Sequence, residues 1–130
     1  MLFRSFEMSN TGWDGSYLHT TRVAAKRAYA EAGVTDPRRE VSMMEVHDCF
    51  SVTELVVMED LGISPEGGAS KDILDGFFDR DGGVPCQVDG GLKCFGHPIG
   101  ASGLRMAYEM YLQLLGRAGD RQIEIGRAHV

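Results

Sequence analysis

The stretch Gly-Gly-Leu-Lys-Cys-Phe-Gly-His-Pro-Ile-Gly-Ala-Ser-Gly, residues 90–103, sets five glycines around a single histidine. Such a run is typical of a turn, because glycine tolerates a positive φ and a close approach of other groups. Pro98 directly follows His97 and suits the first turn of a helix, where its missing N–H costs nothing. The pattern therefore predicts His97 at a helix N-terminus, where N–H groups favour anions and an imidazole can transfer protons near neutral pH. A glycine-rich turn with a surface histidine is the alternative.

The same stretch resembles the histidine signature of the thiolase family, Gly-Gly-x-x-x-x-Gly-His-Pro-x-Gly-x-(Ser/Thr)-Gly. Eight positions match it in a fixed spacing: Gly90, Gly91, Gly96, His97, Pro98, Gly100, Ser102 and Gly103. In thiolases this histidine helps to activate a nucleophilic cysteine and forms part of an oxyanion hole for a thioester oxygen. The resemblance implies both roles for His97. It also implies a substrate-binding role for three neighbours: Gly96, Gly100 and Ser102.

A second turn, residues 47–50, reads His-Asp-Cys-Phe and separates two predicted elements. Residues 41–46 form a short apolar run of strand length, and a helix is predicted from Ser51. His47 and Cys49 stand two apart in this strand-to-helix turn, so their side chains are expected to point in a similar direction. In α/β folds, ligands meet the chain at such strand ends. A structural turn with a buried thiol is the alternative.

The His-Asp-Cys-Phe turn resembles the sterol-carrier-protein type of thiolase, a group that includes lipid-transfer-protein-like acetyl-CoA acetyltransferases. Other thiolases carry Asn-Glu-Ala-Phe at this place, and the asparagine fixes a catalytic water. The resemblance implies that His47 takes over the water-binding role. It further implies that Cys49 is the thiol that transfers a proton to and from the substrate.

Other elements are predicted from periodicity and end signals. They are helices at residues 17–32, 71–78 and 100–115 and a strand at residues 84–88. The first helix is rich in alanine and should lie close on a sheet, with Gly33 ending it. The helix from Ser51 has capping-box spacing to Glu54. Apolar side chains expected to face inward from the other two helices are Ile73, Leu74, Phe77, Phe78, Leu104, Ala107, Met110, Tyr111 and Leu114. Arg105 is expected in solvent.

Composition sets limits on the function. A chain of 130 residues with 43% hydrophobic and 25% charged residues fits a single globular domain. The net charge of −6 argues against a nucleic-acid partner, and no apolar run has the length of a membrane span. The three cysteines, Cys49, Cys86 and Cys94, suit neither a disulfide framework nor a zinc site, so no metal is expected. Free thiols favour a reducing compartment, and we expect the cytoplasm.

The resemblance to thiolases runs over residues 20–122 and implies an α/β fold: a partial, truncated thiolase-like C-terminal domain, with a mixed sheet and covering helices. The implied parent is an acetyl-CoA C-acyltransferase that makes or cleaves a carbon–carbon bond in β-ketoacyl-CoA thioesters. Its partner is an acyl-CoA thioester, coenzyme A is a substrate rather than a cofactor, and the parent is a homo-oligomer. The nucleophilic cysteine would lie in a missing first half, so the fragment alone should be inactive.

Two other functions remain open. One is a thiolase-fold aldolase that cleaves steroid side-chain CoA esters. The other is a non-catalytic acyl-CoA-binding or lipid-binding relative, which would need an apolar tunnel.

Residues 124–130, Glu-Ile-Gly-Arg-Ala-His-Val, read as the translation of a common sequencing-adapter start. We therefore expect the thiolase-like domain to occupy residues 1–123 and the last seven residues to be non-native. An accidental natural sequence is the alternative.

Overall fold

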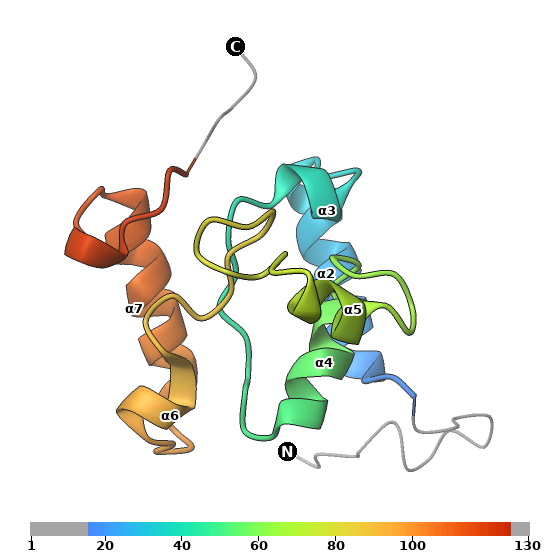
Figure 1. Cartoon of the computed structure of the whole chain (residues 1–130), viewed down its shortest axis with the longest axis horizontal. Helices are drawn as coiled ribbons and strands as arrows, with labels where there is room; N and C mark the ends of the chain where they lie inside the picture. The colour runs from blue at the N-terminus through green and yellow to red at the C-terminus, as the bar shows by residue number, and fades with distance from the viewer. Residues whose placement is uncertain (1–15, 126–130) are drawn as a thin grey trace.

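The computed structural model describes residues 16–125. These residues form six α-helices and one 3-10 helix: α2 (His19–Ala32), α3 (Pro37–Glu40), α4 (Ser51–Asp60), α5 (Ala69–Leu74), α6 (Gly91–Phe95), α7 (Ser102–Leu114) and η1 (Gly119–Arg121). Figure 1 shows α2 to α5 gathered on one side, and α6, α7 and η1 on the other. Extended segments run between the two groups. Most of the predicted non-native segment, residues 126–130, lies outside the described residues.

The predicted strands are reduced to one contact. Met44 and Cys86 form an isolated parallel bridge, and no strand is found elsewhere in residues 16–125. The Met44 N–H donates to Pro85 O at 2.9 Å, and the Gln87 N–H donates to Met44 O at 3.2 Å. The ladder does not extend because Pro85 has no N–H to donate and Gln87 turns the chain at a φ of 54°. The mixed sheet predicted for this part of the chain is therefore not found.

A hydrophobic core lies between the helices of the first group and the bridge. Its buried members are Met44, Val46, Val57, Met58, Ile63, Ala69, Phe78 and Val84. Helix α4 is central to it and packs against both α2 and α5. The apolar residues of α4 and of the bridged segments therefore bury one another without a sheet.

Helix α2 begins two residues later than predicted and ends as predicted. Gly33 adopts the left-handed conformation at a φ of 73°, and its N–H closes the helix on Tyr29 O. The alanine face was expected to lie on a sheet, but α2 packs on α4 and Ala25 is its one buried residue. The Tyr29 hydroxyl donates to Leu61 O at 2.8 Å and fixes the two helices together.

Helices α4 and α5 differ in detail from what the sequence predicts. Phe50 occupies the position before α4, and no side chain caps the helix, so the capping box predicted from Ser51 is absent. Helix α5 is shorter than predicted and leaves Ile73 and Leu74 exposed, while Phe78 beyond its end is buried. The inward placement predicted for Ile73 and Leu74 is therefore wrong.

Helix α7 presents the face opposite to the one predicted. Leu104, Tyr111 and Leu114 are exposed, whereas the buried residues are polar: Ser102, Glu109 and Gln113. Arg105 was expected in solvent, but its side chain is only 15% exposed. The helix is held through its polar side, as described below. No helix within residues 16–125 is long and apolar enough to cross a membrane.

Candidate functional site

The His47–Cys49 turn is fixed against the glycine-rich stretch by side-chain contacts on both sides. Val46 O, just before the turn, accepts a hydrogen bond from Gln87 Nε2 at 2.7 Å. The Asp48 carboxylate accepts the Leu92 N–H, at 3.2 Å to Oδ1 and 3.0 Å to Oδ2. The turn and the start of α6 are thereby joined directly.

The glycines of the second turn adopt the positive φ predicted from sequence, with values of 93° at Gly90, 60° at Gly91 and 75° at Gly96. A side chain at Gly91 would place its Cβ 2.3 Å from Asp48 Oδ2. The Gly91 N–H also donates to Asp89 Oδ1 at 2.8 Å. Glycine is required here because the carboxylate occupies the space of a side chain.

His97 lies just before α7 and not in its first turn. The helix begins at Ser102, and the Pro98 carbonyl accepts the N–H groups of Ala101 and Ser102 in the turn that precedes it. The prediction that Pro98 opens the helix is therefore wrong. His97 nevertheless meets the helix start, since its Nδ1 lies 2.8 Å from Ser102 Oγ.

Ser102 has two hydrogen-bonding neighbours in the turn before α7. Its buried hydroxyl lies 2.8 Å from His97 Nδ1 and 3.3 Å from Pro98 O. If the hydroxyl donates to Pro98 O, a neutral His97 carries its proton on Nδ1 and its lone pair on Nε2. This arrangement suits a general base that accepts a proton at Nε2.

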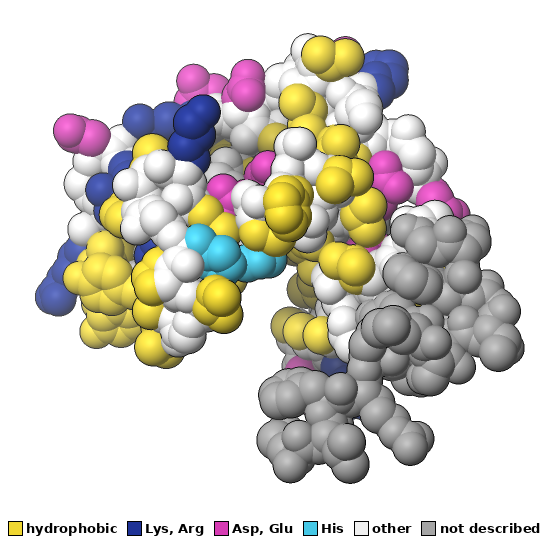
Figure 2. Space-filling view, turned by 90° about the horizontal axis from the view of Figure 1, so that it is seen from below, with side chains coloured by type: hydrophobic (Ala, Val, Ile, Leu, Met, Phe, Trp, Pro, Cys, Tyr) yellow, Lys and Arg dark blue, Asp and Glu magenta, His cyan; other side chains and the backbone are white. Residues whose placement is uncertain are grey.

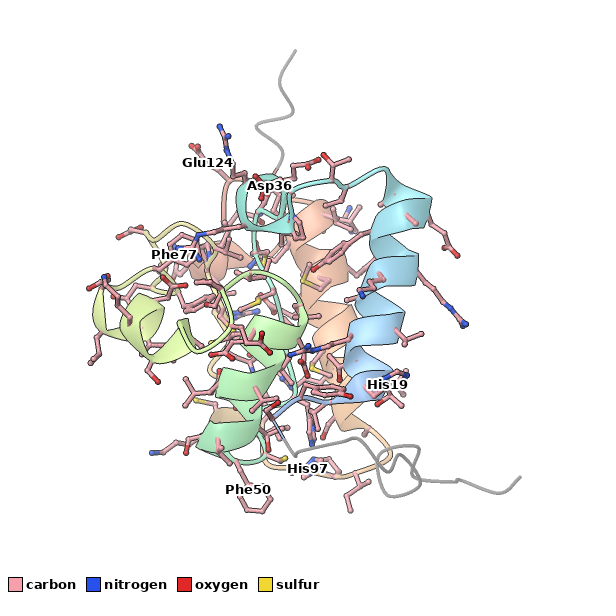
Figure 3. All side chains as sticks on the ribbon, turned by 90° about the vertical axis from the view of Figure 1, so that its right-hand side faces the viewer. His19, Asp36, Phe50, Phe77, His97 and Glu124 are labelled. Carbon is pink, nitrogen blue, oxygen red and sulfur yellow. The ribbon has the colours of Figure 1, made fainter. Side chains whose placement is uncertain are left out.

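The two turns bring two imidazoles into contact. The rings of His47 and His97 lie 4.9 Å apart between centroids and meet edge to face at 60°. Figure 2 shows a histidine patch on the molecular face seen from below, and Figure 3 places His97 at the same end as Phe50. Cys49, half-buried, is held by a different contact, with its Sγ 3.9 Å from Thr53 Oγ1 in α4.

The remaining predicted site residues differ in accessibility. Gly96 and Gly100 are exposed on either side of His97, and neither has an atom within 4 Å of the place where a Cβ would stand. Ser102 is buried beneath the imidazole. The structure therefore joins Ser102 to His97 and leaves the two glycines open to solvent.

A cluster of buried charges lies behind the site. Arg105 of α7 pairs with Asp89, which precedes the glycines, and with Glu45 at 3.4 Å, which precedes Val46. Burial, followed by the charge of Asp89, raises the pKa of Glu45 to about 8, although Arg105 opposes this shift. Sequence reasoning missed Arg105. The signal was a polar stripe at helical spacing: Ser102, Arg105, Glu109 and Gln113.

The other two thiols differ from Cys49. Cys86 packs against the core, with its Sγ 3.9 Å from Glu54 Oε1. Burial and the Glu54 carboxylate raise the pKa of Cys86, so it is a poor nucleophile. Cys94 is exposed. No three histidine, cysteine or acidic side chains come together to hold a metal ion within residues 16–125.

Two surface clefts lie away from the imidazoles. One of about 1180 Å³ is lined by residues that include Asp36, Arg80 and Glu124. Figure 3 places Asp36 and Glu124 at the end of the molecule opposite to His97. A second, of about 670 Å³, is lined by residues of α2 and the region after α4. Neither cleft includes His47, His97 or Cys49. His97 is exposed and His47 is half-buried.

Comparison with known proteins gives consistent matches. A family model described as thiolase C-terminal domain-like matches residues 8–129. Acetyl-CoA acetyltransferase of Methanothermobacter thermautotrophicus is 40% identical over 119 residues, which cover 89% of this chain and 30% of that protein. Sterol carrier protein 2 of Homo sapiens is 38% identical over 103 residues, 79% of this chain and 18% of that protein. Non-specific lipid-transfer protein-like 2 of Caenorhabditis elegans is 39% identical over 100 residues, 76% of this chain and 24% of that protein. The chain spans less than a third of the length of each of these relatives.

Proposed function

The chain belongs to the thiolase C-terminal domain-like family, and from this premise we propose that it is part of a thiolase-type acyltransferase. The longer protein would make or cleave a carbon–carbon bond in β-ketoacyl-CoA thioesters, as the names of its acetyl-CoA acetyltransferase relatives suggest. The observation that carries the proposal is the contact of His47 with His97, delivered by two separate turns. The turn that carries His47 also carries the Cys49 thiol. The two imidazoles and this thiol are groups that can transfer protons.

Each residue has a distinct role in this proposal. His97 takes the proton of a nucleophilic thiol through Nε2, while Ser102 holds its Nδ1–H. The acyl group is carried on that sulfur as a thioester, and His97 then donates a hydrogen bond to a thioester oxygen. Cys49 removes or returns the proton at the substrate α-carbon, and His47 holds a water that binds the other oxygen.

The nucleophilic cysteine is assigned to the part of the longer protein that precedes this chain. The exposure of His97 supports this assignment, because a substrate pocket around it would need a second wall. We further propose that the longer protein is a homo-oligomer that takes acyl-CoA as substrate. A reducing compartment, the cytoplasm, is proposed because all three cysteines are free thiols.

The test is thiolysis of acetoacetyl-CoA by coenzyme A, measured on the longer protein once its reading frame is recovered. His97→Asn and Cys49→Ser should each lower kcat about 10²–10⁴-fold, the usual contribution of a positioned acid or base. Cys94→Ser, an exposed thiol in the same region, is the matched control and should keep full activity. Undiminished turnover in His97→Asn would refute the assignment. The 130-residue chain alone should show no turnover.

A second candidate is a lipid-binding or acyl-CoA-binding relative without turnover. The names of two relatives, sterol carrier protein 2 and non-specific lipid-transfer protein-like 2, favour it. An aldolase acting on steroid side-chain CoA esters is a third. Saturable acyl-CoA binding by the longer protein with no thiolysis would favour the second candidate, and cleavage without coenzyme A would favour the third.

A further inference from the structure

The contact of the two imidazoles needs a support that the rings themselves do not provide. An edge-to-face ring pair is a weak interaction by itself. His97 is exposed, and its turn is far from His47 in sequence. Something must therefore hold one turn against the other.

Asp48 is placed to do this. It stands between His47 and Cys49, and both of its carboxylate oxygens accept the Leu92 N–H. On the other turn, Gly91 leaves the space that the carboxylate fills, since a Cβ there would lie 2.3 Å from Oδ2. A charged acceptor on a backbone N–H forms one of the stronger hydrogen bonds in a protein. The fit of carboxylate and glycine also fixes the separation of the two turns.

Two other links join the same segments of the chain. Gln87 donates to Val46 O, and Arg105 pairs with Glu45 and Asp89 behind the turns. They attach the segments that lead into the turns. The Asp48 carboxylate differs from both because it belongs to the His47–Cys49 turn itself and bonds the start of α6 directly.

We propose that Asp48 is the positioning residue of the imidazole pair: its carboxylate, seated on Gly91 and bonded to Leu92, holds His47 against His97. Its role in turnover rests on the proposed function, where Asp48 would set the geometry of the acid–base groups without touching the substrate. The geometric claim stands without any catalytic activity.

The test is the nuclear Overhauser effect between ring protons of His47 and His97, recorded on the 130-residue chain with labelled histidine. Asp48→Ala should abolish this cross-peak while far-ultraviolet circular dichroism stays unchanged. Asp48→Asn, which keeps an oxygen acceptor, should restore it at least in part. The matched control is Glu59→Ala, which removes a carboxylate that accepts the Ala69 N–H at 3.1 Å elsewhere in the molecule. This variant should keep the cross-peak.

A cross-peak of full strength in Asp48→Ala would overturn the proposal. If that variant does not fold, the wild-type chain decides: a scalar coupling across the hydrogen bond should connect Leu92 N with the Asp48 carboxyl carbon, and its absence would also overturn the proposal. None of these measurements requires catalysis. A longer protein that lacks thiolysis while the ring contact depends on Asp48 would refute the proposed function alone.

Discussion

The two groups of helices differ in where their apolar side chains lie. Around α4, apolar side chains such as Met58 and Ile63 are almost fully buried. Along α7, apolar side chains such as Leu114, at 70% exposure, face solvent. The buried side of α7 is polar: Arg105 pairs with Asp89, and Gln113 Nε2 donates to Arg121 O at 2.8 Å.

The difference shows which interactions carry each part of the fold. Burial of apolar area contributes about 25 cal/mol per Å² and needs no particular geometry. A buried ion pair stabilises only when its partners are well placed, and loss of one partner leaves an uncompensated charge. The α2–α5 group should therefore respond most to loss of volume, and the α6–α7 group most to changes in charge and turn geometry.

The largest effect is expected in the core. Met58→Ala removes a side chain that is 2% exposed and leaves a cavity beside α4. We expect the free energy of unfolding to fall by about 2–5 kcal/mol. Urea denaturation followed by circular dichroism measures it. A cost below about 1 kcal/mol would mean that the α2–α5 core is not closed.

The junction between the two groups should be the next most sensitive place. Gly91→Ala adds a methyl group against the Asp48 carboxylate at a φ of 60°, and should cost about 2–3 kcal/mol through strain and overpacking. Gly116→Ala is the matched control, because its φ is 65° with no neighbour near the new Cβ. It should cost about 1 kcal/mol. Equal losses of unfolding free energy in the two variants would show that Asp48 does not occupy the space beside Gly91.

The buried charges behind α7 should make stability depend on pH. The pKa of Glu45 rises from about 4.5 in the unfolded chain to about 8 in the fold, where Asp89, Glu109 and Arg105 face it. The stabilisation from its protonated form is complete below pH 4.5 and is lost as the pH rises through 8. Glu45→Gln should therefore raise the unfolding free energy at pH 8 by about 1–2 kcal/mol and change it little at pH 4.5. Urea titrations at both pH values test this, and a variant less stable at pH 8 than the wild type would contradict it.

The smallest effect is expected on the exposed face of α7. Leu114→Ala removes an apolar side chain as Met58→Ala does, but from a position at 70% exposure. The unfolding free energy should change by no more than about 0.5 kcal/mol. If the same urea assay instead showed a loss near that of Met58→Ala, the face of α7 would be covered in solution.

Local features could be predicted from the sequence, and long-range ones could not. The positive φ at Gly90, Gly91 and Gly96 and the helix ending at Gly33 follow from the properties of glycine. The contact of His47 with His97 joins two turns that are far apart in the sequence, and no local pattern predicts it.

The failures share a physical cause. Helical periodicity shows which residues lie on one face, but not which face the rest of the molecule covers, so Leu104 and Leu114 were placed inward. Arg105 was missed because its partners, Glu45 and Asp89, lie on other segments of the chain. The prediction of a sheet was wrong because an apolar run of strand length forms a ladder only when a second extended segment pairs with it along its length.

Only a single bridge, between Met44 and Cys86, aligns the two extended segments. The buried charges around Arg105 therefore help to fix their register. In an ordinary sheet many backbone bridges keep two strands in register, but here a single bridge does so. Successive residues of an extended segment point to opposite sides, so Met44 enters the core while Glu45 meets Arg105. A slip of one residue would drive a carboxylate into hydrocarbon and leave a guanidinium facing a thioether. The alignment of the two segments is thus enforced by the cost of every misaligned pairing, rather than by the number of backbone hydrogen bonds.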